Sequence, residues 1–166
     1  MSCTSGPLTV RDAGCSDAAL LLGLIGELAD YERLSEMVTG SEQDLAGALS
    51  GPAPVAEALI AERGGDTAGF ALFFATFSTF RCQSGLWLED LFVRPAHRGA
   101  GVGRELMGQV ARRALARNAG RLEWTALSWN DPALRFYAKL GAQTMDDWTS
   151  HRVEGDALRN AAGLAA

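Results

Sequence analysis

Apolar residues recur at two different spacings along the chain, and these spacings predict where helices and strands form. Over 16–30 and 102–117, apolar side chains return every three or four positions, which is typical of a helix with one buried face. Shorter runs are continuously apolar or alternate with polar residues, which is typical of strands. These runs predict strands at 8–11, 55–63, 68–79, 86–93 and 122–127.

Polar residues mark the starts of the predicted helices. Asp17, or the serine before it, can cap the first helix, because a short polar side chain accepts hydrogen bonds from the free N–H groups there. Ser41, with Asp44 three positions later, predicts a second short helix over 41–49. The polar segment 31–40 between these helices ends in a glycine and is expected to be a loop or a short helix.

Glycine and proline divide the rest of the chain. Gly-Gly-Asp at 64–66 separates two predicted strands and is typical of a hairpin turn. Asp131 as a cap and Pro132 in the first turn open a helix. Gly141 closes that helix, and the tail from Trp148 is expected to supply a last strand. The order β-α-α-β-β-β-α-β-α-β predicts an α+β (mixed α/β) domain around one core.

Composition and charge narrow the possible functions. The chain has 166 residues, of which 48% are hydrophobic and 21% charged, as in a single globular domain. Fifteen basic and 20 acidic residues give a formal net charge of -5. A nucleic-acid partner is therefore disfavoured, since binding to a phosphate backbone needs a concentrated basic face. An acidic domain is better suited to a small cationic partner.

The cysteines and the apolar runs bear on the compartment. Cys3, Cys15 and Cys82 are odd in number and irregularly spaced, so they predict neither a disulfide framework nor a metal site. The first residues lack the basic and apolar segments of a signal peptide. The longest apolar stretch, 18–25, is too short to span a bilayer. We therefore expect a cytoplasmic protein with no metal and no membrane partner.

The most informative segment is 94–103, RPAHRGAGVG, between a predicted strand and a predicted helix. Gly99, Gly101 and Gly103 have no side chains. The N–H groups of this turn can therefore converge on an anion at the positive end of the helix dipole. Arg98 adds a guanidinium beside this turn. The segment predicts a diphosphate site, and the alternative is a glycine-rich turn needed only for tight packing.

Other phosphate-binding motifs do not fit this segment. A dinucleotide fingerprint would need glycine where Arg104 or Leu106 stands, and a P-loop would need a lysine, whereas the only lysine is the distant Lys139. His97 is expected to lie at the surface of the loop rather than to act as a catalytic base.

Two adjacent carboxylates, Glu89 and Asp90, interrupt an otherwise apolar strand. Such groups are costly to bury and are candidates for a raised pKa and for proton transfer. The apolar alternation breaks at 89–92, which predicts a β-bulge. The alternative is a carboxylate pair on an exposed edge strand. Strict alternation would place Leu86, Leu88, Asp90 and Phe92 on one face of the sheet and Trp87, Glu89, Leu91 and Val93 on the other.

Five segments together resemble a known family. LEDLFVRPAHRGAGVGRELM at 88–107 is similar to the coenzyme A signature of the GNAT N-acetyltransferases. The remaining segments resemble, in order, the spermidine/spermine (diamine) acetyltransferases and their thialysine-acetylating relatives. They are ELADYERL at 27–34, AGFALFF at 68–74, WLEDLFV at 87–93 and WNDPALRFYAKLGA at 129–142.

The resemblance implies the GNAT acyl-CoA N-acyltransferase fold, with a central, mostly antiparallel mixed sheet flanked by about four helices. It also implies acetyl-CoA as cosubstrate, a primary amine of a small cationic molecule as acceptor, and a homodimer. The acceptor would be a polyamine, thialysine or a related amino acid. The alternatives are a non-catalytic acyl-CoA sensor and an enzyme acting on another amine, such as a protein N-terminus.

The chemistry requires a proton acceptor and a proton donor, because an alkylamine is almost entirely protonated at neutral pH and a thiolate departs. We expect Glu89 to accept the proton, and the resemblance implies that it does so through a water molecule. Tyr137 is the expected donor by the resemblance, although its spacing with Ala133, Phe136 and Leu140 also fits a packing face.

The resemblance implies further contacts on both sides of the reaction. The segment after Gly141 is shorter than in the polyamine enzymes, so the sequence does not decide which amine is acetylated. The expected coenzyme-binding residues are Leu91, Phe92, Val93, Arg98, Gly99, Ala100, Gly101, Val102, Gly103, Arg104, Asn130, Asp131, Pro132 and Ala133. The expected amine-binding residues are Tyr31, Glu32, Glu89, Asp90, Glu123, Trp124 and Thr125.

Overall fold

A computed structural model describes residues 6–164 of the chain, and Cys3 lies outside them. The chain divides into two compact units, one reaching to Thr125 and one beginning at Ala126. No helix among residues 6–164 is long and apolar enough to cross a membrane.

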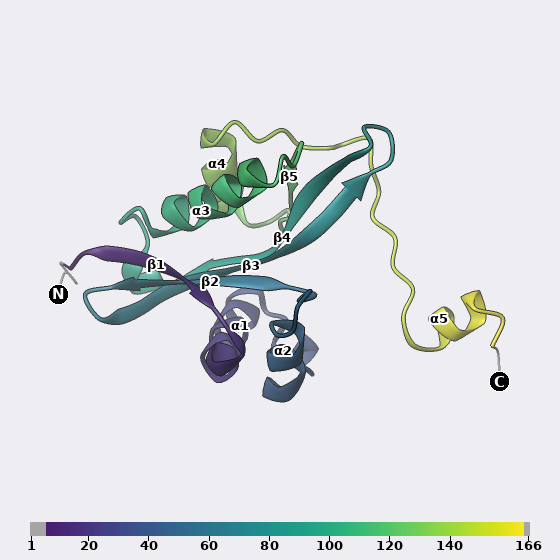
Figure 1. Cartoon of the computed structure of the whole chain (residues 1–166), viewed down its shortest axis with the longest axis horizontal. Helices are drawn as coiled ribbons and strands as arrows, with labels where there is room; N and C mark the ends of the chain where they lie inside the picture. Colours follow the sequence, from purple (N-terminus) through teal and green to yellow (C-terminus); the bar gives the residue numbers. More distant parts are fainter. Residues whose placement is uncertain (1–5, 165–166) are drawn as a thin grey trace. The chain divides into compact units, whose positions relative to one another are not determined.

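The first unit is built on a five-stranded sheet with the strand order β1-β2-β3-β4-β5 (Figure 1). Neighbouring strands are antiparallel except β4 and β5, which are parallel, so the expected mixed, mostly antiparallel sheet is confirmed. Gly64 and Gly65 form the turn between β2 and β3 with φ of 61° and 89°, a left-handed conformation that favours glycine. The strands are β1 (Leu8–Ala13), β2 (Glu57–Arg63), β3 (Asp66–Ser78), β4 (Gln83–Val93) and β5 (Leu122–Glu123).

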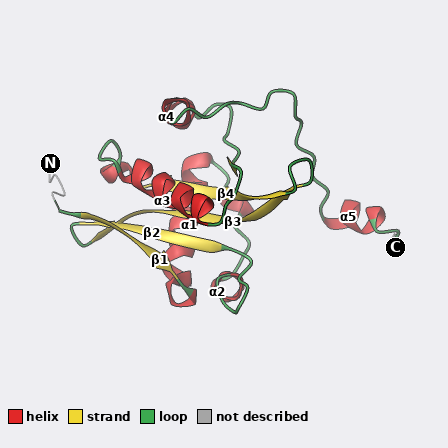
Figure 2. Cartoon of the chain, turned by 45° about the horizontal axis from the view of Figure 1, so that its top comes forward, coloured by secondary structure: helices red, strands yellow, loops and turns green. Residues whose placement is uncertain are grey.

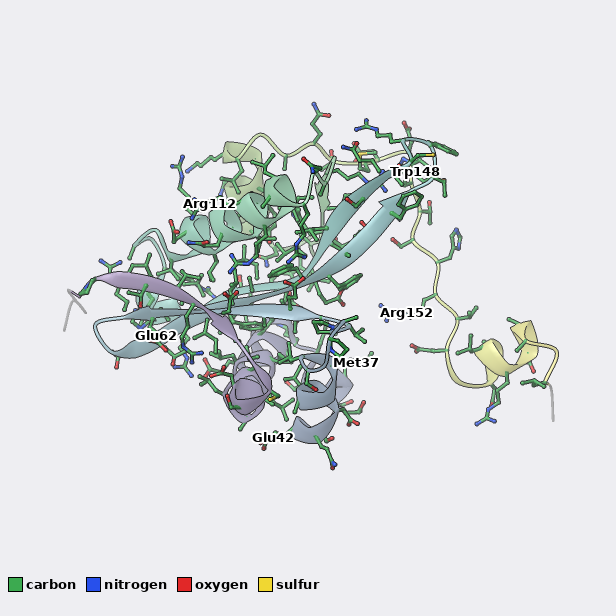
Figure 3. All side chains as sticks on the ribbon, viewed as in Figure 1. Met37, Glu42, Glu62, Arg112, Trp148 and Arg152 are labelled. Atoms are coloured by element: carbon green, nitrogen blue, oxygen red, sulfur yellow. The ribbon has the colours of Figure 1, made fainter. Side chains whose placement is uncertain are left out.

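Helices cover both faces of this sheet. The helices α1 (Ala18–Glu32) and α2 (Glu42–Ala48) lie on one face and α3 (Val102–Ala116) lies on the other, as Figures 1 and 2 show from two directions. Helix α3 contacts the first four strands, whereas α1 contacts β3 and α2. In Figure 3, Glu42 and Arg112 mark the outer sides of the two helical layers. Short 3-10 turns lie at Cys15–Asp17, Ser35–Met37 and Pro95–His97.

The core is divided between the two faces of the sheet. On the α1 face, the buried side chains of Leu21 and Leu24 pack with Phe70 and Phe92. Burial of each such side chain contributes about 1.5–3 kcal/mol to stability. On the other face, α3 buries apolar residues at the helical spacing that its sequence predicts. They are Val102, Leu106, Met107, Val110 and Ala114.

The two N-terminal helices begin differently. Ser41 and Asp44 form the predicted capping box, in which the Ser41 hydroxyl accepts from the Asp44 N–H at 3.2 Å and the Asp44 carboxylate accepts from the Ser41 N–H at 3.0 Å. Asp17 stands directly before α1 as predicted, yet its carboxylate accepts from the Gly14 N–H at 2.9 Å and from Arg11. Asp17 therefore ties the β1–α1 connection instead of capping α1.

The fifth strand is shorter than predicted. Only Leu122 and Glu123 pair with β4, opposite Leu86 and Trp87, so the expected strand over 122–127 ends after two residues. The register would next bring Trp124 opposite Leu88 and Thr125 opposite Glu89, where β4 bulges. The parallel pairing therefore stops two residues before the position opposite the bulge.

The second unit contains two helices, α4 (Asp131–Lys139) and α5 (Gly155–Ala161). The cap of α4 is Asn130, whose side-chain oxygen accepts from the Ala133 N–H at 3.4 Å, so the prediction that Asp131 is the cap is wrong by one residue. The strand predicted from Trp148 is also wrong. None of the described residues of the tail pairs with a strand, and the polar segment beginning at Gly155 forms α5 instead.

Candidate active site

A bulge in β4 sets the geometry of the two predicted carboxylates. Leu72 of β3 pairs with Asp90 and Phe73 pairs with Leu88, so Glu89 has no partner on β3 and the predicted bulge is confirmed. An extra residue reverses the side-chain alternation beyond it. Leu88 therefore shares the α3 face with Phe73, while Asp90 shares the α1 face with Leu72.

This reversal corrects one expectation. Strict alternation would place Leu86, Leu88, Asp90 and Phe92 on a single face, whereas the register divides them between the two faces. Phe92 packs in the cluster that contains Leu21 and Leu24 of α1, which confirms its side of the sheet. The physical reason is that two residues of β4 span the distance of one residue on β3.

Glu89 and Asp90 have different surroundings as a result. Glu89 is exposed, and the indole Nε1–H of Trp87 donates to its Oε2 at 2.9 Å. Asp90 is half-buried, and loss of water together with the charges of Glu89 and Glu32 raises its pKa from the ordinary 3.8 to about 6. Partial burial also raises the pKa of Glu32, the last residue of α1. Three carboxylates thus share one electrostatic environment.

The end of α1 meets the segment after β4. The Arg98 guanidinium carbon lies 4.5 Å from the ring centroid of Tyr31, which is a cation–π contact. The Nε–H of Arg98 also donates to the carbonyl oxygen of Val93 at 2.9 Å. Tyr31 and Glu32 therefore lie beside both the bulged strand and the glycine-rich loop.

The glycine-rich loop has the conformation expected of an anion site. Gly99 and Gly101 have φ of 73° and 86°. A Cβ built at either glycine would meet nothing within 4 Å, so tight packing does not explain why glycine stands there. Gly101 is the N-cap of α3, so the cap residue has no side chain that could accept from the N–H groups of that helix. Free N–H groups and a positive helix end fit a diphosphate such as that of coenzyme A.

A second arginine, on β2, forms a hydrogen bond to this loop. The Nη1–H of Arg63, the last residue of β2, donates to the carbonyl oxygen of Ala100 at 2.8 Å. The remaining predicted loop residues, Val102, Gly103 and Arg104, belong to the first turn of α3, where Val102 is buried and Arg104 is exposed. The loop is thus held from β2 on one side and from α1, through Arg98, on the other.

The early end of β5 leaves part of β4 unpaired on that side. The β4–β5 ladder contains Leu86 and Trp87 but not the residues from Leu88 to Val93. On this edge no strand among residues 6–164 pairs with Leu91 or Val93, and the carbonyl oxygen of Val93 accepts from Arg98 instead. Such an edge can pair with the amide groups of an extended ligand.

The predicted amine-side residues on β5 differ from the others. Glu123 forms an ion pair with Arg121 at 2.6 Å, so its carboxylate already has a cationic partner. Trp124 and Thr125 follow directly and lie outside the ladder. Glu123 thus has a less available charge than Glu32 or Asp90.

In the second unit, Tyr137 lies on α4, half-buried, with its ring centroid 5.3 Å from that of Phe136. Asn130, Pro132 and Ala133 form the start of the same helix. Asp131 is exposed and lies 3.9 Å from Arg135 one turn later. The sequence motif from Asn130 to Tyr137 is therefore one capped helix with its aromatic pair in the second turn.

Sequence reasoning missed two contacts and misplaced one residue. Trp87 stands two positions before Glu89, a spacing that could have suggested their contact on a strand. Arg63 is 37 positions from Ala100, and no local signal predicts that contact. His97 is buried with 5% exposure, and its Nδ1 has no hydrogen-bond partner among the described residues, so the expected surface position is wrong. The 3-10 turn at Pro95–His97 turns the imidazole inward.

No group of three or more His, Cys, Asp or Glu among residues 6–164 is arranged to hold a metal ion.

Comparisons with known proteins show the family of the chain. The family described as Acetyltransferase (GNAT) family matches residues 27–142. Thialysine N-epsilon-acetyltransferase of Bos taurus is 35% identical over 165 residues, covering 93% of this chain and 96% of that protein. L-ornithine N5-acetyltransferase of Arabidopsis thaliana is 40% identical over 92 residues, covering 55% of this chain and 40% of that protein.

Among solved structures, an integron cassette protein from the mobile metagenome of V. cholerae has a TM-score of 0.77 and 30% sequence identity. That match covers 93% of this chain and 97% of the other.

Proposed function

Because this chain belongs to the acetyltransferase (GNAT) family and is an acyltransferase, we propose that it transfers an acetyl group from acetyl-CoA to a primary amine of a small cationic molecule. The observation that carries the proposal is the segment from Glu89 to Gly101. Within it, a bulge that exposes one carboxylate and half-buries another is followed directly by the open, glycine-rich turn at the start of α3.

On the coenzyme side, the turn from Arg98 to Gly103 would hold the diphosphate with backbone N–H groups and the guanidinium of Arg98. The unpaired edge of β4 at Leu91–Val93 would bind the pantetheine arm through backbone hydrogen bonds. The bound thioester supplies an acetyl group that is already activated, so no serine or cysteine nucleophile is needed.

On the amine side, the three carboxylates would have different roles. Exposed Glu89, oriented by Trp87, would accept the proton of the ammonium group through water. Asp90 and Glu32 would hold the positive charge of the substrate, because their own proximity makes a cation favourable there. The amine nitrogen then forms a bond to the acetyl carbon as the carbon–sulfur bond breaks.

The departing thiolate needs a proton, and Tyr137 is the proposed donor. A phenol with a pKa of ~10 stays protonated at neutral pH and can reprotonate a thiolate whose parent thiol has a pKa of ~8.5. The support for this assignment is the motif from Asn130 to Tyr137, and we propose that Asn130 to Ala133 line the coenzyme. A Tyr137→Phe variant is expected to bind CoA normally while kcat falls by at least tenfold.

The two named relatives suggest the substrate class. The names of both describe enzymes that acetylate the side-chain amine of an amino acid, thialysine in one and L-ornithine in the other. We propose that the acceptor here is the side-chain amine of a basic amino acid or the terminal amine of a polyamine. A second cationic group of such a molecule would lie near Asp90 and Glu32.

A thiol-release assay with acetyl-CoA tests this function. The panel contains thialysine, lysine, ornithine, spermidine and spermine, with a neutral-chain monoamine and a peptide N-terminus as comparisons. Release of free thiol with one or more of the cationic amines is expected. Binding of CoA without any thiol release would instead indicate a sensor, and activity confined to peptide N-termini would contradict the proposed substrate class.

The organisation of the active protein is also proposed. We propose that both units belong to one catalytic domain, since the family match runs from residue 27 to residue 142 across their boundary. The homodimer and the cytoplasmic location expected from the sequence stay predictions.

A further inference from the structure

Helix α1 is attached to the segment after β4 by two parallel contacts. Arg94 donates from Nε to Oε2 of Glu27 at 2.9 Å, and from Nη1 to the carbonyl oxygen of Thr67 at 3.0 Å. Arg98, four positions later, places its guanidinium over the ring of Tyr31, which is four positions after Glu27. Residues four apart lie on one side of a helix, so Glu27 and Tyr31 form one edge of α1 that faces the two arginines.

The position of Tyr31 is well determined by the end of α1. Arg33 is the C-cap in a left-handed conformation with φ of 62°, and the Leu34 N–H closes the last turn on the Ala29 carbonyl at 2.8 Å. Ala29 is buried in the same turn. The ring of Tyr31 therefore projects from a fixed helical turn rather than from a loop.

We propose that Tyr31 is a positioning residue for the coenzyme: its ring face holds the Arg98 guanidinium in the orientation that binds the diphosphate. This inference rests on the proposed function, and it assigns a coenzyme-side effect to a residue that resemblance alone places on the amine side.

The physical reason lies in the mobility of an arginine side chain. Arg98 is exposed, and its described hydrogen bond uses Nε, which leaves both terminal nitrogens to face a ligand. An exposed arginine loses much rotamer freedom when it binds an anion. A ring that already stacks on the guanidinium reduces this loss, so binding is stronger without any direct contact between Tyr31 and the coenzyme.

Calorimetric titration of CoA, without any amine, tests the proposal in the full-length protein. Tyr31→Phe keeps the ring face and is expected to bind CoA within about twofold of wild type. Tyr31→Leu removes the ring and is expected to weaken CoA binding by about three- to tenfold. Phe80→Leu is the matched control, because Phe80 is a 95% exposed aromatic residue at the tip of the β3–β4 hairpin, and it is expected to bind as wild type.

A double-mutant cycle shows whether the effect passes through Arg98. In an Arg98→Ala background, Tyr31→Leu is expected to cause no further loss of CoA affinity. Wild-type affinity in Tyr31→Leu would overturn the proposal, and so would equal losses in Tyr31→Phe and Tyr31→Leu. Additive losses with Arg98→Ala would overturn it as well. Failure of the wild-type protein to bind CoA at all would instead overturn the proposed function, so the two failures are distinguishable.

Discussion

At the scale of single residues, Glu89 and Asp90 are neighbours in the chain with opposite surroundings. The bulge leaves Glu89 exposed and bonded to an indole N–H, while Asp90 turns toward α1 and is half-buried near Glu32. Two carboxylates that differ in burial can take different tasks on one substrate. The pH dependence and the response to substitution of each one are therefore separately testable.

The raised pKa of Asp90 predicts an acid limb in the activity. Asp90 is ionised above its pKa of about 6 and neutral below it, so its attraction for a cation is lost as the pH falls through 6. The kcat/KM for the amine is expected to fall below pH 6 in wild type. In Asp90→Asn the value is expected to be lower at pH 8 and to lack this limb. A limb of the same midpoint in Asp90→Asn would contradict the assignment.

The same pKa predicts that Asp90 lowers stability at neutral pH. Its pKa is raised from 3.8 to about 6 on folding, so the folded state holds the proton more tightly and stability falls as the pH rises through this range. Asp90→Asn is expected to raise the free energy of unfolding, relative to wild type, by about 1–2 kcal/mol more at pH 8 than at pH 3.5. This range allows for solvent screening of a half-exposed group. Urea unfolding at both pH values measures this, with exposed Asp147→Asn as the control.

The Trp87–Glu89 contact predicts that loss of the indole N–H lowers kcat/KM for the amine. Trp87→Phe keeps an aromatic ring but removes the N–H that bonds Glu89 at 2.9 Å. The kcat/KM for the amine is expected to fall by about three- to tenfold, because a hydrogen bond to a charged group contributes on the order of 1 kcal/mol when exposed. Trp148→Phe, at an exposed tryptophan, is expected to change nothing. If Trp87→Phe lowered kcat/KM by the same factor in a Glu89→Gln background, the loss would not pass through Glu89, and the prediction would be wrong.

At the scale of elements, the proposed site depends on places where regular structure stops. The parallel ladder of β5 ends at Trp87, two residues before the bulge in β4, and leaves the β4 edge at Leu91–Val93 without a strand partner among the described residues. Gly101, the cap residue of α3, has no side chain that could accept from the N–H groups of the helix. Unpaired backbone groups bind ligands without using side-chain chemistry, and this accounts for how little of the coenzyme side depends on reactive residues.

Two glycine-to-alanine substitutions are expected to have opposite effects. Gly101 has φ of 86°, so Gly101→Ala is expected to lower the free energy of unfolding by about 1 kcal/mol and to weaken CoA binding by about tenfold. Gly23 lies inside α1, is exposed and has open space at the position of a Cβ. Gly23→Ala is expected to raise that free energy by about 0.5–1 kcal/mol and to leave CoA binding unchanged. Urea unfolding and calorimetry give both quantities, and normal CoA affinity in Gly101→Ala would contradict the proposed loop.

At the scale of the whole molecule, charge of both signs serves the proposed reaction. The chain carries a formal net charge of -5, yet Arg63 and Arg98 flank the glycine-rich loop. An acidic molecule concentrates small cations near its surface, while local arginines and helix N–H groups bind an anion at short range. In the proposed reaction, the two substrates would thus be attracted by charges that act over different distances.

This division predicts a salt dependence that distinguishes diamines from monoamines. Between about 20 and 200 mM salt, the kcat/KM for 1,5-diaminopentane is expected to fall by about three- to tenfold, because screening weakens attraction to Glu32 and Asp90. Pentylamine, which lacks the second charge, is expected to change by less than half as much. Initial rates at saturating acetyl-CoA measure both, and equal dependence for the two amines would contradict a site for a second cation.

Local patterns predicted most of the elements and the conformation of the loop. The helical spacing of 102–117 matches α3, the Ser41–Asp44 cap matches α2, and the carboxylate break in β4 matches the bulge. The cap of α4 is wrong by one residue, which is a local error, and two other failures concern long-range pairing. The strand over 122–127 pairs with β4 over only two residues, and the tail from Trp148 finds no strand partner among the described residues.

The sequence by itself determined where the chain turns, which residues tolerate a left-handed backbone and where charge enters an apolar strand, because these depend on neighbours in the chain. Only the tertiary structure decided that Asp90 rather than Glu89 loses water and that Tyr31 meets Arg98. Burial and pairing of this kind join residues dozens of positions apart. They follow from how strands and helices pack, and no periodicity in the sequence records them.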